Sequence, residues 1–398
     1  MSLPFDRKLW AWALYDFANT IFSAVVLTSY FPLYLTERAG ANWYLGAATT
    51  GSMILAGLVT PVLGALSDRT GRPRHYLFTA TILCILSLCL ITFLRAPAAL
   101  ISAFIVSCFF FHAALVFYNC LLPAAAAPER QGFASGLGTG LGYLGVVISL
   151  PIAHAVDQWL GRSWVFAATA LLFALFSAPL FLYVPERHVE NPVPLKSSLW
   201  ISEWRKVMTL VRGLPARPAL LLFLAGNFFA VDALNSTIFW LAVYTRETFH
   251  PPQTVLVLFL MLVNASAFGM GIIAGALTDR RGSSRVLAAA AGSLAVTLAI
   301  CASSGRFILF AGACLTGGAF AIAGIWTAGR KRLIEMAPPA QLGEYFGLYG
   351  LTTKISVLGS LLFSLTADLA GFRPALWVLV FPAAAGFCML FVSARMEK

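Results

Sequence analysis

Long, nearly uncharged apolar runs recur along the whole sequence. Twelve can be marked, at about residues 10–34, 45–66, 76–94, 98–121, 132–156, 163–184, 218–244, 253–277, 286–304, 307–329, 344–367 and 375–394. A helix of about 20 apolar residues crosses the hydrocarbon core of a bilayer. Of the 398 residues only 11% are charged, against about 25% in soluble domains. The sequence therefore predicts an all-α integral membrane protein with twelve transmembrane helices. It excludes a soluble enzyme or a nucleic-acid-binding domain.

The distribution of basic residues predicts the orientation. Twenty of the 27 Lys and Arg residues fall on the side of the runs that holds both termini and segment 185–217, and six fall on the other side. Loops rich in Lys and Arg stay in the cytoplasm, so both termini are expected there. No small-residue cleavage site ends the first run, which predicts a retained span and not a signal peptide. Short loops and the lack of a targeting segment favour a bacterial plasma membrane.

Two short patterns occur once in each half of the chain. Asp16-Phe-Ala-Asn19 in the first run matches Asp232-Ala-Leu-Asn235 in the seventh, 216 residues later. The pattern G-A-L-[ST]-D-R-x-G occurs at 64–71 and again at 275–282, 211 residues later. Parallel repeats of this kind are typical of transporters. We therefore predict a six-helix half at 1–184, a cytoplasmic linker at 185–217 and a second six-helix half at 218–398.

The repeated G-A-L-[ST]-D-R-x-G loop resembles the signature of the major facilitator superfamily between its second and third spans. The chemistry of the loop can be read directly. Gly71 permits a tight turn, and Asp68 can cap the next helix or accept a hydrogen bond from a neighbouring span. The resemblance implies a cytoplasmic latch that governs alternation between inward- and outward-open states. The residues concerned are Asp68, Arg69, Gly71 and Arg72 in the first loop, and Asp279, Arg280 and Gly282 in the second.

Three further stretches resemble the vacuolar, autophagy-related amino-acid effluxer family and its bacterial relatives. They are Ala11–Asn19, Val116–Pro123 and Glu344–Lys354. The resemblance implies a carrier of an amino acid. The chain departs from the family at Gly329, where a serine is usual, and at Ser360, where a proline is usual.

Three ionisable side chains lie deep in the predicted spans: Asp16, Asp232 and Lys354. Such groups are costly in a bilayer and are functional candidates by default. A carboxyl in a span can take up a proton on one side and release it on the other, so Asp16 or Asp232 is the predicted proton-coupling site. Asn19 and Asn235, one helical turn further on, are predicted to bind the solute or the carboxyl. In the alternative interpretation, each D-x-x-N pattern only holds helices together.

Lys354 has two interpretations of equal weight. It binds a substrate carboxylate, or it pairs with Asp16 or Asp232 as an internal ion pair. Its counterpart in the first half is Gly140, so the charge is not repeated. The remaining predicted substrate-binding residues are polar or aromatic side chains in spans, for which packing is the alternative role. They are Tyr15, Tyr118, Asn119 and Tyr143.

The linker and the glycines carry two structural predictions. Apolar residues at helical spacing in 199–214 predict a basic amphipathic helix on the cytoplasmic leaflet, the alternative being a solvated connector. The pairs Gly136/Gly140 and Gly271/Gly275 have the four-residue spacing that lets membrane helices approach closely.

The leading functional prediction is a monomeric secondary transporter of a small polar solute, coupled to protons or another ion. An exporter of amphipathic drugs or lipids and a non-transporting solute sensor are the alternatives. The chain carries no H-E-x-x-H, G-x-S-x-G or nucleotide-binding pattern, and its cysteines form no C-x-x-C pair. An enzyme, a cofactor and a bound metal are therefore not expected.

Overall fold

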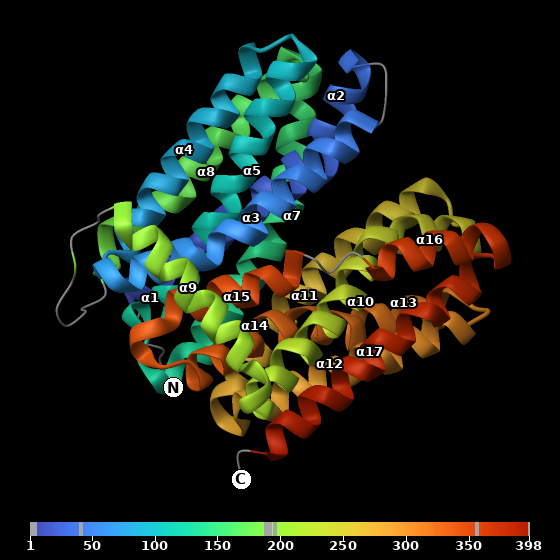
Figure 1. The fold of residues 1–398 in the computed structure, drawn as a ribbon. Coiled ribbons are helices and arrows are strands. Elements are labelled where there is room, and N and C mark those ends of the chain that lie inside the picture. Colours follow the sequence, from blue (N-terminus) through green and yellow to red (C-terminus); the bar gives the residue numbers. More distant parts are fainter. Residues whose placement is uncertain (1–5, 40–42, 187–192, 194–196, 355–357, 397–398) are drawn as a thin grey trace. The chain divides into compact units, whose positions relative to one another are not determined.

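The computed structural model describes residues 6–39, 43–186, 193, 197–354 and 358–396. Throughout these ranges every regular element is a helix (Figure 1). Twelve helical segments in the described part of the chain are long and apolar enough to cross a membrane, and each predicted run overlaps one of them. The predicted all-α fold with twelve spans is confirmed.

The helices follow one another with short connections. In the first half they are α1 (Arg7–Ile21), the π-helical segment η1 (Phe22–Tyr30), α2 (Phe31–Ala39), α3 (Trp43–Thr70), α4 (Pro73–Phe93), α5 (Pro97–Cys120), α6 (Leu122–Ala125), α7 (Gln131–Leu160) and α8 (Trp164–Tyr183). The linker holds α9 (Ser197–Gly213). The second half contains α10 (Pro218–Phe249), α11 (Gln253–Arg281), α12 (Ser283–Ser303), α13 (Phe307–Ala313), the π-helical segment η4 (Cys314–Gly318), α14 (Ala319–Met336), α15 (Leu342–Lys354), α16 (Leu358–Ala370) and α17 (Phe372–Arg395).

Proline and glycine set many of the helix boundaries. Pro73, Pro97 and Pro218 stand at the first position of α4, α5 and α10, where a missing N–H costs nothing. Gly161 follows α7 with φ 91° and Gly371 follows α16 with φ 93°. A left-handed residue stops a helix, and glycine adopts that conformation without strain.

Contacts group the chain into two compact units. Unit 1 contains Met1–Pro128, Leu141–Met208 and Ala337–Leu351, and unit 2 contains Glu129–Gly140, Thr209–Met336 and Thr352–Lys398. The start of α7 thus belongs with unit 2, and most of α15 belongs with unit 1. The boundaries 1–184, 185–217 and 218–398 stay a prediction about the sequence repeat.

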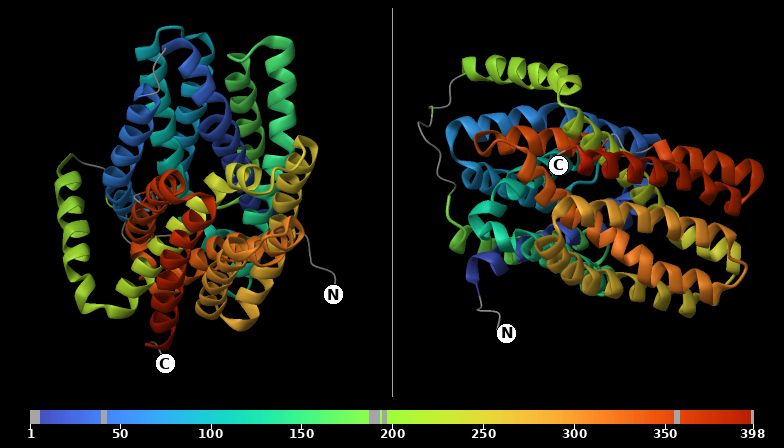
Figure 2. Two further views of the ribbon diagram at one scale, coloured as in Figure 1. Left: turned by 90° about the vertical axis from the view of Figure 1, so that its right-hand side faces the viewer. Right: turned by 90° about the horizontal axis from the view of Figure 1, so that it is seen from below.

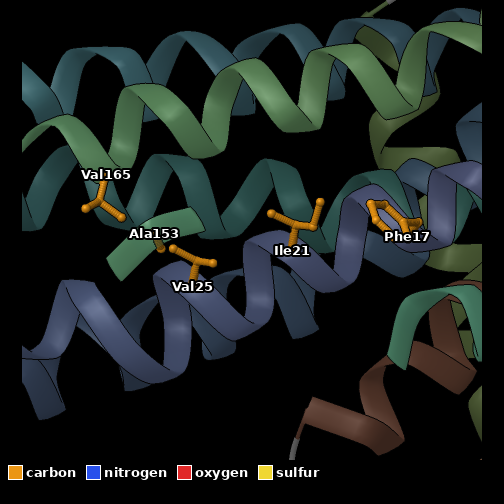
Figure 3. Packing of buried hydrophobic residues seen from close by; sticks show 5 residues of the cluster. All are labelled: Phe17, Ile21, Val25, Ala153 and Val165. Carbon is orange, nitrogen blue, oxygen red and sulfur yellow. The ribbon is translucent and has the colours of Figure 1, made fainter. Parts of the chain in front are cut away.

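The core of unit 1 is built around the first span. Phe17, Ile21 and Val25 lie at i, i+4 and i+8 and form one stripe (Figure 3). The stripe packs on Ala153 of α7 and Val165 of α8. Four-residue spacing keeps side chains on one helix face. This stripe therefore determines which face of the first span is buried in unit 1. Asp16 and Asn19 are carried on the same buried helix.

The core of unit 2 depends on close helix contact. α17 packs against both α10 and α12. A Cβ added at Gly386 of α17 would lie 2.9 Å from the carbonyl oxygen of Gly226 in α10. The contact therefore requires a residue without a side chain, and it fixes α10, which carries Asp232.

The linker helix α9 packs on unit 1 through one residue of its apolar stripe. Val207 is buried against Val62, Ala65 and Leu66 of α3. Figure 2 shows α9 as the yellow-green helix that follows the grey trace. Glu203 of α9 is buried and accepts hydrogen bonds from Lys206 at 2.8 and 3.0 Å. Protein therefore covers part of the surface that was expected to face lipid or water. Contact of α9 with the leaflet stays a prediction.

Candidate functional site

A buried carboxyl lies at the junction of α10 and α16 in unit 2. Asp232 is 3% exposed. Its Oδ2 accepts a hydrogen bond of 2.8 Å from the N–H of Gly359, in the first turn of α16. This hydrogen bond joins α10 to the backbone of α16.

The second oxygen of this carboxyl, Oδ1, differs from Oδ2 in its hydrogen bonding. Asp232 Oδ1 has no hydrogen-bond partner among the described residues, and neither has Oγ of Ser236, one turn further along α10. A Cβ at Gly359 would lie 2.8 Å from Asp232 Oδ2 and 2.8 Å from Ser236 Oγ. The glycine leaves room for both groups, and one carboxyl oxygen remains available for a proton.

Lys354 lies in the same unit, immediately before the junction. It is the last residue of α15 and is 8% exposed. Residues 355–357 lie outside the described part of the chain, and α16 begins at Leu358. Lys354 and Gly359, whose N–H binds Asp232, thus lie close together in sequence within the eleventh span. Substrate binding and internal ion pairing both stay predictions for Lys354.

Unit 1 repeats the arrangement around Asp16. This residue is 5% exposed, and Thr20, one turn on, donates to its backbone oxygen at 2.9 Å. Thr20 stands 216 residues before Ser236, the same offset that separates Asp16 from Asp232. A Cβ at Gly142 of α7 would lie 2.5 Å from Thr20 Oγ1. In each unit, an aspartate and a hydroxyl one turn later lie next to a glycine of another span.

The predicted asparagines differ in their surroundings. Asn19 is buried, and neither amide atom has a hydrogen-bond partner in the described part of the chain. Asn235 is half-buried. A buried amide without partners costs about 1–3 kcal/mol, and solute binding stays a prediction for Asn19.

Asn227 of α10 was missed by the sequence analysis. It is fully buried, and both its amide atoms also lack partners among the described residues. A polar amide in an apolar run was the signal that could have revealed it. The same argument that marks Asn19 in unit 1 marks Asn227 in unit 2.

Two of the predicted tyrosines are packed against each other. Tyr15 and Tyr118 are fully buried, with ring centroids 5.0 Å apart and planes 21° apart. Trp12 stacks on the other side of Tyr118 at 4.3 Å, and its Nε1 donates to the Tyr118 backbone oxygen at 3.0 Å. Tyr143 and Asn119 are half-buried. A role of these four residues in solute binding stays a prediction.

Tyr15→Phe is expected to lower stability without changing the apparent KM for solute. The Tyr15 hydroxyl bonds to Oγ1 of Thr81 at 2.5 Å, and a lost hydrogen bond of this kind costs about 1 kcal/mol. Thermal melts of purified protein should fall by a few degrees, while Tyr183→Phe, on an exposed ring, should leave the melt unchanged. A raised KM with an unchanged melt would instead place Tyr15 in the solute path.

The aspartates of the two repeated loops bind helix N-termini. Asp279 accepts from the N–H groups of Gly132 and Phe133 at 2.8 and 2.7 Å, and from Lys331 Nζ at 2.6 Å. Asp68 accepts from the N–H of Glu344 at 3.0 Å. Each carboxylate thus satisfies first-turn donors of α7 or α15 and is favoured there by the helix dipole. Of the two roles expected for Asp68, bonding to a neighbouring span is the observed one.

Glycines bring these helices together. A Cβ at Gly64 would lie 1.9 Å from the oxygen of Gly343, and one at Gly275 would lie 2.7 Å from the oxygen of Gly132. Gly132 and Gly343 are themselves 211 residues apart, the offset of the two loops. The predicted close packing of the four-residue glycine pairs is also confirmed, since a Cβ at Gly136 would lie 2.2 Å from the oxygen of Gly271.

The other loop residues stand at the surface. Arg69, Arg72 and Arg280 are exposed. Gly71 has φ 69° and Gly282 has φ 91°, so the tight turn expected at Gly71 is present and recurs in the second loop. The loop geometry is therefore repeated along with its sequence.

A model of the Major Facilitator Superfamily matches residues 12–302. The chain belongs to this superfamily. It is a multi-pass membrane transporter and not an enzyme, and superfamily members carry small-molecule solutes.

Relatives of similar length are bacterial. An uncharacterized MFS-type transporter of Bacillus subtilis (strain 168) is 25% identical over 400 residues, which cover 93% of this chain and 91% of the relative. An uncharacterized protein of Aquifex aeolicus (strain VF5) is 27% identical over 358 residues, covering 88% and 86%.

Solved structures show the same fold at low sequence identity. The human organic anion transporter MFSD10 (TETRAN) has a TM-score of 0.74 at 15% identity, covering 98% of this chain and all of that one. A bacterial homologue of the iron transporter ferroportin in an outward-facing state has 0.74 at 17% identity, covering 98% of each chain. The proton:xylose symporter XylE has 0.72 at 14%, covering 97% and 94%. These likenesses support the superfamily fold and do not select a solute.

Proposed function

We propose that this superfamily member is a proton-coupled secondary transporter of a small polar solute, with an amino acid as the solute class. The observation that carries the proposal is Asp232, a buried carboxyl with one oxygen bonded to the backbone of α16 and the other without a partner among the described residues. A charged group in a span is expensive, and its presence there therefore marks a functional candidate. Asp16 is the matching candidate in unit 1.

The solute class rests on chemistry and on resemblance. Lys354 supplies a buried cation at the end of α15 and suits a carboxylate, while the amides of Asn19 and Asn227 suit polar groups of a small solute. The solved relatives carry an organic anion, iron or xylose by name, so they do not narrow the class. The stretches that resemble amino-acid effluxers favour an amino acid.

One departure from the effluxer pattern makes a contact of its own. Trp240 Nε1 donates to Ser360 Oγ at 3.0 Å, a bond that proline at this position could not accept through a side chain. The bond links α10 to α16 one residue after Gly359. This bond supports a site in which α10 and α16 move as one body. It also favours a solute preference that differs from that of the effluxer family.

The two repeated loops are proposed to form the latch of alternating access. Asp68 and Glu344 come from different halves of the sequence, as do Asp279 and Gly132. Arg69, Gly71, Arg72, Arg280 and Gly282 complete the two loops. We expect both carboxylate–helix bonds to break when the halves separate at this end. The charge distribution favours the cytoplasm for this end and for both termini, and the bacterial relatives favour a plasma membrane. A monomer is the proposed functional unit.

An exporter of amphipathic molecules receives less support. An almost wholly apolar pocket in unit 2, lined by residues such as Leu234, Tyr244 and Phe310, has a volume of about 40 Å³. Drug-sized ligands occupy roughly 300–1,000 Å³. A measurement of solute flux distinguishes a sensor from a transporter, because a sensor would bind solute without transporting it.

The test uses purified protein in liposomes that hold a pH-sensitive dye. Amino acids and related organic acids are added one at a time, and a solute-dependent pH change identifies both substrate and coupling. Lys354→Ala is expected to raise the apparent KM for a carboxylate solute about tenfold or more, since a lost charge-assisted hydrogen bond costs about 1.5–3 kcal/mol. Lys8→Ala, on an exposed side chain, should leave KM unchanged.

Each outcome bears on the proposal. No pH change with any solute, despite folded protein and an imposed gradient, would overturn proton coupling. An unchanged KM in Lys354→Ala, with loss of folded protein, would assign the lysine to an internal ion pair and not to the solute.

A further inference from the structure

A basic pocket lies in unit 2 where α11 and α17 end and α12 begins. It has a volume of about 880 Å³. Its charged lining consists of Arg280, Arg281, Arg285 and Arg395, and no acidic residue contributes to it. The volume is large enough for a ligand of several functional groups.

Within the described residues, no carboxylate neutralises the positive charge of this pocket. None of the four arginines makes an ion pair with a carboxylate in the described part of the chain. The neighbouring acids are used elsewhere: Asp279 binds Lys331, and Glu335 accepts from Ser283 Oγ and lies 3.9 Å from Arg332. Four unpaired guanidinium groups at one site favour an anionic ligand.

One wall of the pocket is apolar. Phe387 and Phe391 of α17 face Ala288 and Ala289 of α12 across it. The guanidinium of Arg395 lies 4.4 Å from the centroid of the Phe391 ring. All four arginines stand at or near the ends of candidate membrane spans, which is the headgroup level of a bilayer. The charged part is therefore at the interface, and the apolar wall continues toward the hydrocarbon.

We propose that this pocket binds an anionic phospholipid, with its phosphate on the arginines and an acyl chain along Phe387 and Phe391. Guanidinium groups match phosphate oxygens in a two-bond geometry, and the N-terminus of α12 adds backbone donors and a favourable dipole. A soluble phosphate would leave the apolar wall unused. Four arginines suit a lipid with two phosphates, such as diphosphatidylglycerol, better than a lipid with one.

The experiment compares two triple variants of the full-length protein in detergent. One is Arg281→Gln, Arg285→Gln and Arg395→Gln in the pocket. Its control is Arg246→Gln, Arg306→Gln and Arg373→Gln, three exposed arginines outside the pocket lining, so both variants lose the same charge. Native mass spectrometry counts retained lipid, and thermal melts follow titration with diphosphatidylglycerol, phosphatidylglycerol or glycerol 3-phosphate.

We expect diphosphatidylglycerol to raise the melting temperature of the wild type and the control, because a ligand that binds only folded protein stabilises it. In the pocket variant, the lipid concentration for half the shift should rise on the order of a hundredfold, given the contribution of each basic side chain near an anionic surface. Equal weakening in both variants would overturn the site in favour of general charge attraction. A shift with glycerol 3-phosphate as large as that with lipid would overturn the lipid as occupant.

Discussion

Replacing Asp232 by asparagine is expected to abolish proton-driven accumulation of solute while solute exchange continues. The asparagine oxygen can still accept the N–H of Gly359, so the α10–α16 contact remains. The amide cannot carry a proton between the two sides of the membrane. With one proton per solute, a pH difference of one unit drives about a tenfold solute ratio, since a factor of ten is about 1.4 kcal/mol. The variant should stop at a ratio of about 1.

The measurement is uptake of labelled solute into liposomes with and without an imposed pH gradient, beside counterflow without a gradient. Asp16→Asn is the matched variant, because Asp16 occupies the equivalent position in unit 1 and a coupling site need not be duplicated. Loss of accumulation in the Asp16 variant alone would transfer coupling to unit 1. Full accumulation in both variants would contradict a carboxyl mechanism, and loss of folded protein in the Asp232 variant would favour the helix-holding role.

The helices and the repeat could be predicted from local sequence, because each span satisfies its own backbone and shows its apolar composition directly. The two D-x-x-N patterns located Asp16 and Asp232 correctly on buried helices. The turn at Gly71 followed from the chemistry of a single residue. These features need no knowledge of which helices are neighbours.

The partners of the same residues depend on helices distant in sequence. Asn235 was predicted to bind the solute or the carboxyl of Asp232, and Ser236, which was not predicted, lies with that carboxyl against Gly359. Spacings of three and four both place a residue on the same helix face, and only the position of α16 decides between them. Asn227 was missed because no repeated pattern contains it.

The contacts of the two loop aspartates could also have been predicted from the sequence. The N–H groups that donate to these aspartates belong to Gly132 and Glu344. Both residues lie in the first turn of a helix that is more than sixty residues away in sequence from the loop it contacts. The 211-residue offset nevertheless relates Gly132 to Gly343 as it relates Gly64 to Gly275. A search for glycines separated by this offset would have identified both contact pairs, Gly64 with Gly343 and Gly275 with Gly132.

Gly343→Leu is expected to reduce transport by about tenfold or more, because it prevents α15 from reaching α3. A Cβ at this position would lie 2.3 Å from the oxygen of Gly64 and 2.9 Å from Ser67 Oγ, and backbone cannot yield as a flexible side chain does. Overpacking of this kind costs about 1–3 kcal/mol. The neighbouring N–H of Glu344 then moves away from Asp68, so the substitution removes close packing and the helix cap together.

The matched substitution in the other unit is Gly132→Leu, where a Cβ would lie 2.5 Å from Asp279 Oδ1. Gly312→Leu is the control, since nothing lies within 4 Å of its Cβ position on an exposed stretch of α13. Initial rates of solute exchange and thermal melts are measured on all three variants. If both loops form the latch, the initial rate of solute exchange falls by a similar factor in Gly343→Leu and Gly132→Leu and is unchanged in Gly312→Leu. Normal rates in Gly343→Leu and Gly132→Leu, with unchanged melts, would show that these contacts are packing that transport never has to break.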